Sequence, residues 1–87
     1  METNHALLNV TWNGQNGDNP EPVSWDLSDA EILVIAQESI RSGHIPGIRQ
    51  DEKATLTDFV VDRFSATTEP PIAARLMVRP KVPFGSQ

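Results

Sequence analysis

Residues 28–43 (SDAEILVIAQESIRSG) constrain the fold of this chain most strongly, because they carry the signals of a complete helix. Ser28 followed by Glu31 has the spacing of an N-terminal capping box. Gly43 fits the position after the last turn, where a positive φ is needed. The aliphatic residues between these ends fall on one arc at 100° per residue. Such a helix needs an apolar surface to lie on, and the rest of the chain must supply it.

Alternating apolar residues before the helix predict that part of this surface is a hairpin. Residues 5–12 predict a strand whose even-numbered side chains face the core. Residues 13–22 contain two Asn-Gly pairs and two prolines, and we interpret them as a loop longer than a tight turn. Residues 23–27 alternate again and predict the second strand, which leads directly into the helix.

The segment after the helix leaves one choice open. Residues 59–64 are rich in β-branched and aromatic side chains, which favours a strand. Thr55 and Asp58 could instead form a second capping box, and the apolar residues around them also fit helical spacing. We favour the strand. Residues 72–81 predict the last strand, which Pro80 should end.

The predicted fold class is therefore α+β: a small mixed sheet of about four strands packed on one amphipathic helix, in the order ββαββ. We expect residues 1–87 to form a single domain, with frayed ends at about residues 1–5 and 85–87. We expect one cluster between helix and sheet, made of the following residues: Trp12, Trp25, Ile32, Ala36, Ile40 and Leu76.

This pattern resembles the β-grasp, or ubiquitin-like, family. The resemblance rests on the hairpin over residues 6–27, the acidic start of the helix at Asp26–Asp29, the amphipathic helix, and Ile45–Pro46 before two further strands. It implies a binding module that presents an adaptor surface. Ubiquitin-like modifiers end in a Gly-Gly tail, whereas this chain ends in the sequence Phe-Gly-Ser-Gln, a departure that argues against conjugation.

The charge of the chain is unevenly distributed. The net charge is −5, and residues 1–40 contain seven acidic side chains but no Lys or Arg, so all seven basic residues follow. This asymmetry suggests two faces of opposite potential, although chance and helix-end chemistry would also produce it. The chain has no cysteine, which excludes thiol chemistry and fits a cytoplasmic protein. No apolar run reaches the length of a membrane span, and no signal peptide is visible.

The residues able to do chemistry are few, and we expect no catalytic residue, no metal and no cofactor. His5 lies near the N-terminus, and His44 follows the helix, where the helix dipole would stabilise its charged form. Asp58 and Asp62 would be too far apart on a strand to share a proton, so we interpret them as solvated. No spacing matches a metalloprotease, calcium-loop, phosphate-binding or nucleophile motif.

Two surfaces remain as candidates for binding. The outward side of the last strand carries a basic stripe, and the predicted hairpin loop carries two acids; these residues are Arg75, Met77, Arg79, Lys81, Asp18 and Glu21. The hypothesis is a non-catalytic protein-interaction module, a ubiquitin-like adaptor whose partner is another protein. The acidic pI near 4.7 disfavours nucleic acid. The alternatives are an acidic inhibitor that imitates nucleic acid, of phage or anti-restriction type, and a small-molecule binder.

Overall fold

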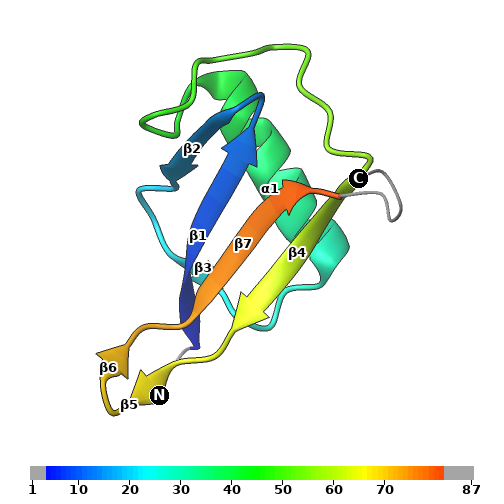
Figure 1. The fold of residues 1–87 in the computed structure, drawn as a ribbon. Coiled ribbons are helices and arrows are strands. Elements are labelled where there is room, and N and C mark those ends of the chain that lie inside the picture. Colours follow the sequence, from blue (N-terminus) through cyan, green and yellow to red (C-terminus); the bar gives the residue numbers. More distant parts are fainter. Residues whose placement is uncertain (1–3, 82–87) are drawn as a thin grey trace, which may run out of the picture.

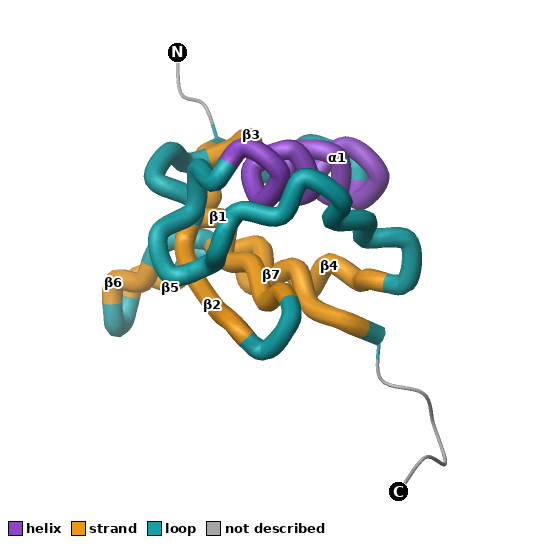
Figure 2. The backbone as a smooth tube through the Cα atoms, turned by 90° about the horizontal axis from the view of Figure 1, so that it is seen from above, coloured by secondary structure: helices purple, strands orange, loops and turns teal. Residues whose placement is uncertain are grey.

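A computed structural model describes residues 4–81 and shows one helix packed on one face of a mixed sheet (Figures 1 and 2). The elements, in chain order, are β1 (His5–Trp12), β2 (Gln15–Asp18), β3 (Val23–Ser24), α1 (Asp29–Ser42), β4 (Phe59–Phe64), β5 (Thr67–Thr68), β6 (Pro71–Ile72) and β7 (Arg75–Pro80). The main sheet has the order β2-β1-β7-β4, with β3 also paired to β1. The α+β class is thus confirmed. The predicted C-terminal frayed end, residues 85–87, lies outside the described residues.

Helix α1 follows the sequence signals closely. The Ser28 hydroxyl accepts a hydrogen bond from the Glu31 N–H, and the Glu31 carboxylate accepts one from the Ser28 N–H, which closes the capping box. Gly43 ends the helix with φ +72°. The predicted inner arc is confirmed by the burial of Ile32, Ala36 and Ile40. Within residues 4–81, no helix has both the length and the apolar character that a membrane span requires.

The first hairpin is tighter than the sequence prediction. Asn13 (φ +54°) and Gly14 (φ +78°) form a two-residue turn, and β2 starts at once with Gln15. Two consecutive positive φ values give the turn whose twist matches that of paired strands. The prediction that residues 13–22 are all loop is therefore wrong over Gln15–Asp18, because the prolines that suggested a loop come only after β2.

The predicted strand over residues 23–27 is also wrong in extent. Only Val23–Ser24 pairs with the start of β1, opposite Ala6 and His5. The chain then turns towards the helix, since the Leu27 N–H donates to the Ser24 carbonyl at 3.4 Å. His5 belongs to β1, so the N-terminal fraying expected up to residue 5 does not extend to it.

The second half of the sheet agrees with the favoured choice. Residues 59–64 form strand β4, which runs antiparallel to β7 with Val61 opposite Val78. Strand β7 in turn runs parallel to β1, with Leu8 opposite Leu76. The first and last strands therefore lie side by side in the middle of the sheet. Between β4 and β7, the short strands β5 and β6 form a small arm that projects from the sheet (Figure 1).

The core lies between α1 and the sheet, but the two tryptophans do not meet in it. Ile32, Ala36, Ile40 and Leu76 are at most 1 % exposed, as predicted, whereas Trp12 and Trp25 are half-buried at its margin. Trp12 packs on Phe59, with ring centroids 5.7 Å apart. Trp25 lies beside Ser65 and Ala74, at the opposite end of the sheet. Because β2, not residues 23–27, pairs with Trp12, the expected tryptophan pair cannot form.

Three contacts join the β2 edge of the sheet to the loop that follows the helix. Gly17 lies so close to the loop that an added Cβ would come within 2.1 Å of the Pro46 carbonyl oxygen. Gly47, at φ +92°, approaches the Asn16 carbonyl in the same way. The Arg49 N–H also donates to Gln15 Oε1 at 2.7 Å. The loop thus covers the inner side of this edge.

Arg63 makes the corresponding contacts near β4. It projects from the inner side of β4 and donates to the carbonyl oxygens of Trp25 (2.9 Å) and Leu27 (2.7 Å). It also pairs with Asp29 at 2.7 Å, in the first turn of α1. The guanidinium lies 5.7 Å from the centre of the Trp25 ring. One side chain therefore joins the end of β4 to the start of the helix.

Candidate functional site

The face of the sheet that α1 does not cover, which we call the open face, carries most of the predicted binding residues (Figure 2). Side chains alternate along each strand, so the residues between the buried ones point outward. With the pairing register, this assigns to the open face Asn16 and Asp18 of β2, Leu7, Asn9 and Thr11 of β1, Arg75, Met77 and Arg79 of β7, and Val60, Asp62 and Phe64 of β4.

Arg75 lies between two exposed apolar side chains. In the sheet it is opposite Leu7 of β1 on one side and Phe64 of β4 on the other. Leu7 is 47 % and Phe64 44 % exposed, and the Arg75 guanidinium lies 5.4 Å from the centre of the Phe64 ring. A cation held over an aromatic ring is fixed in position and still free to bind an anion with its outward N–H groups. This combination can receive a carboxylate flanked by apolar groups.

The other residues of the predicted basic stripe differ in their exposure and in their charge pairing. Met77 is partly buried between Asn9 and Asp62. Arg79 is bonded to Asp62 through its Nε, so part of its charge is neutralised. Lys81 is exposed just beyond β7, where its backbone N–H donates to the Asp58 carbonyl at 2.9 Å. Arg75 is therefore the residue of the stripe best placed to contact a partner.

The two predicted acidic residues are separated. Asp18 is on the open face, where its carboxylate accepts a hydrogen bond from Asn9 Nδ2 at 2.8 Å. Asn9 and Asn16 also form hydrogen bonds with each other, so the polar side chains at this corner hold one another in position. Glu21 lies in the β2–β3 connection, with its Oε1 3.7 Å from His44 Nε2. The structure thus brings Asp18, but not Glu21, onto the same face as Arg75.

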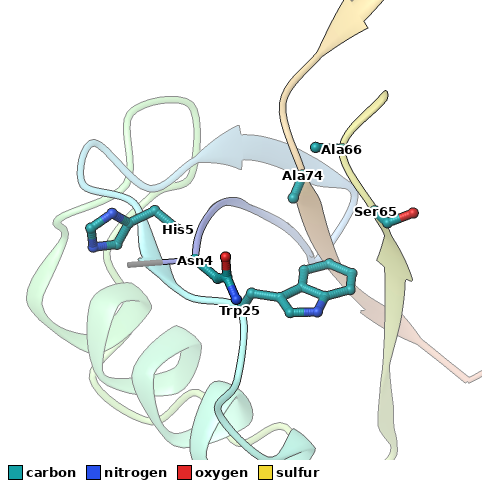
Figure 3. Close-up of a pocket in the computed structure, with 6 residues that line it drawn as sticks. All are labelled: Asn4, His5, Trp25, Ser65, Ala66 and Ala74. Atoms are coloured by element: carbon teal, nitrogen blue, oxygen red, sulfur yellow. The ribbon is translucent and has the colours of Figure 1, made fainter. Parts of the chain in front are cut away.

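A cavity of about 350 Å³ lies beside Trp25, next to the end of β4 (Figure 3). It is lined by Asn4, His5, Trp25, Ser65, Ala66 and Ala74. In Figure 3 the indole of Trp25 extends towards the strand that carries Ser65, below Ala74 and Ala66, while the imidazole of His5 points away from the indole. Its walls offer an indole ring, methyl groups, one amide and one hydroxyl. Such walls suit an apolar or aromatic group of modest size.

The titratable residues considered in the sequence analysis lie at separate places in the fold. His44 is near Glu21, Asp62 is bonded to Arg79, and Asp58 lies just before the start of β4. Within residues 4–81, no group of three potential metal ligands comes together. The pKa of Glu31 is lowered, chiefly because its carboxylate accepts a hydrogen bond from the Ser28 backbone N–H. That shift reflects helix capping.

The apolar part of this surface was not singled out from the sequence. Leu7 and Phe64 join Arg75 only because β1 and β4 pair with opposite sides of β7. The alternation in residues 5–12 places Leu7 outward, which was the available signal, but it does not show which side chains lie beside it. Comparisons with protein-family models, with curated proteins and with solved structures found no match.

Proposed function

We propose that this chain is a non-catalytic protein-interaction module that binds another protein through the open face of its sheet. The observation that carries the proposal is the position of Arg75 between the exposed side chains of Leu7 and Phe64. Arginine and aromatic residues surrounded by apolar area are enriched in protein interfaces and contribute most to their affinity. The proposed partner presents a carboxylate among apolar side chains.

The same proposal includes the family type of the module, its location and the class of its partner. A β-grasp, ubiquitin-like adaptor is supported by the β1–β2 hairpin, the single helix on one face, and the later strands β4 and β7. A cytoplasmic location is supported by the lack of cysteine. Nucleic acid is a poorer partner, because Asp18 and Asp62 lie on the same face as the arginines.

The test compares two variants on opposite faces. Arg75→Glu reverses the charge between Leu7 and Phe64 on the open face, and Val34→Glu places the same side chain on the outer arc of α1, where Val34 is 54 % exposed. Proteins retained from native lysate by the unchanged chain and by both variants are identified. The dissociation constant of the recovered partner is then measured by calorimetry with the purified proteins.

We expect Arg75→Glu to weaken binding at least about tenfold, and Val34→Glu to leave it within about twofold, because only the former is a central interface charge. If a partner bound Arg75→Glu normally and lost affinity for Val34→Glu, the interface would be on helix α1 and not on the open face. Failure of every retained protein to bind the purified chain would contradict the proposal.

Small-molecule binding is a second candidate function, favoured by the cavity beside Trp25. In a Trp12→Phe background, Trp25 is the sole tryptophan and reports on the cavity by fluorescence. A metabolite that saturates a Trp25 signal at micromolar concentration, and loses that signal in Ala74→Phe, would support this function. An acidic inhibitor that imitates nucleic acid is less well supported, since acids occur on the open face (Asp62), in α1 (Glu38) and in the β5–β6 arm (Glu69).

A further inference from the structure

Within residues 4–81, strand β4 is an outer strand of the sheet and pairs on one side only. Its partner is β7, and no other described strand follows β4 in the sheet order. The Lys81 N–H donates to the Asp58 carbonyl, so the backbone groups of every second residue from 58 face β7. The N–H and C=O groups of Val61 and Arg63 consequently point away from the sheet. They are the groups that an added strand would bind.

Strand β4 has two charged residues but few of the other features that usually protect an edge. Its sequence, FVVDRF, contains no proline or glycine and is rich in β-branched and aromatic residues. Its two charged side chains are both engaged within the chain. Asp62 is bonded to Arg79 on the open face, and Arg63 is bonded to Leu27 and Asp29 beside the helix. Neither charge extends along the edge to repel another strand.

The sequence of β4 is complementary to itself in one antiparallel register. With Val61 opposite the Val61 of a second copy, Phe59 faces Arg63, Val60 faces Asp62 and Phe64 faces Asp58. Moving the centre to Asp62 would place two Asp62 side chains opposite each other, and moving it to Val60 would place Asp58 opposite Asp62. Only the register centred on Val61 avoids opposing carboxylates while it pairs the whole strand.

We propose that β4 binds the β4 of a second copy of this chain, centred on Val61, to form a two-fold dimer with one continuous sheet. The hydrogen bonds across the interface join Val61 to Val61 through both backbone groups, and the Arg63 N–H of each copy to the Phe59 carbonyl of the other, because the Phe59 N–H donates to the Leu56 carbonyl of its own chain. The two-fold axis is perpendicular to the sheet, so both open faces lie on the same side. The dimer presents two copies of Arg75 to one partner surface, which goes beyond the binding activity proposed for a single chain.

The test uses opposite charges at Val60, which faces Asp62 of the second copy on the open face. Val60→Glu places two like-charged pairs in the dimer, and Val60→Lys places two opposite-charged pairs there. Within its own chain residue 60 faces Arg79, so the folding of the monomer favours Glu over Lys. The expected order of dimer affinity is therefore the reverse of the expected order of monomer stability, and the two effects are distinguishable.

Sedimentation equilibrium is measured from about 10 µM to about 1 mM. We expect the unchanged chain to show a concentration-dependent dimer, Val60→Glu to weaken it about tenfold, and Val60→Lys to weaken it not at all. In amide hydrogen exchange, Val61 and Arg63 should become slower as concentration rises. A chain that stays monomeric at about 1 mM would overturn the proposal and leave this edge to an extended peptide. Equal weakening by both variants, with no change at the Val61 amide, would overturn it in favour of contact through the open face.

Discussion

At the β2 edge of the sheet, the loop after α1 packs against the strand, whereas at the β4 edge only side chains reach back to the helix. The first edge is closed by Gly17 and Gly47, which let two backbones approach. At the second edge, no strand within residues 4–81 pairs with the outward backbone groups of Val61 and Arg63, and the Arg63 side chain connects the strand to the chain on its inner side. Close contact between two backbones requires glycine at fixed positions, whereas the contacts at the β4 edge depend on one long side chain. The two edges should therefore respond to substitution in different ways.

The largest effect is expected from Gly17→Ala. The added methyl group would come within 2.1 Å of the Pro46 carbonyl oxygen and 2.8 Å of Ile45 Cγ2. The loop would have to move, and we expect a loss of about 3 kcal/mol in the free energy of unfolding. Urea denaturation measures it. Gly14→Asn is the control, because the turn position is open and asparagine tolerates its positive φ; a similar loss in both variants would contradict this account of the closed edge.

Arg63→Ala should have the next largest effect. It removes charge-assisted hydrogen bonds to Trp25, Leu27 and Asp29, and we expect a loss of about 1–3 kcal/mol. The matched variant is Arg79→Ala, which breaks only the ion pair with Asp62 on the open face and should cost less than about 1 kcal/mol. If thermal unfolding ranks the two variants in the opposite order, the β4 edge is not braced by Arg63.

Gln15→Ala should have a smaller effect at the closed edge. It removes the acceptor for the Arg49 N–H and leaves the glycine contacts in place, so we expect a loss of about 0.5–1.5 kcal/mol. Glu52→Ala, an exposed position of the same loop, is the control. Chemical denaturation of both variants measures the loss in the free energy of unfolding. If Gln15→Ala lost as much as Gly17→Ala, the Gln15 side chain and not the glycine contacts would be the main link between β2 and the loop.

The smallest effect is expected at the start of α1, which Arg63 joins to β4. Hydrogen bonds from Ser28 lower the pKa of Glu31 in the folded chain, so its carboxylate stabilises the fold above the unfolded pKa of about 4.3. This contribution is lost as pH falls through the lower folded pKa. Unfolding of Glu31→Gln, measured from pH 7 to pH 3, should differ from that of the unchanged chain only at the higher pH values. If the difference in stability between the two proteins persisted at pH 3, the lowered pKa of Glu31 would not be its cause.

The sequence predicts the locally determined parts of this structure well. Ser28, Glu31 and Gly43 define α1 through contacts within a few residues of each other, and their spacing was sufficient. The inward series of β1 and β7 was predicted correctly for the same reason. Strand β2 was missed because QNGD has little strand propensity; it pairs through the Asn13–Gly14 turn and is covered by the loop against Gly17.

The candidate surface was predictable only in part. Arg75, Met77 and Arg79 share a face by simple alternation, but their neighbours depend on which strands pair with β7. Gln37 illustrates the same difficulty. Its place on the outer arc of the helix predicts an exposed side chain whose substitution hardly changes stability. In the structure Gln37 is half-buried, and its Oε1 accepts a hydrogen bond from the Leu56 N–H at 3.1 Å. Contacts between distant segments are set by register, which alternation alone does not specify.

The position of β7 beside β1 determines when during synthesis this domain can fold. Leu8 pairs with Leu76, so the two middle strands are separated by nearly the whole chain. A nascent chain that has not yet released residue 80 from the ribosome has a capped helix and a hairpin but no strand to place between β1 and β4. Contacts of such long range slow folding, because the loop must close before the contact forms. Folding should therefore occur only once residue 80 has left the ribosome, rather than progressively, and a chaperone would find Leu8 and Val10 exposed until then.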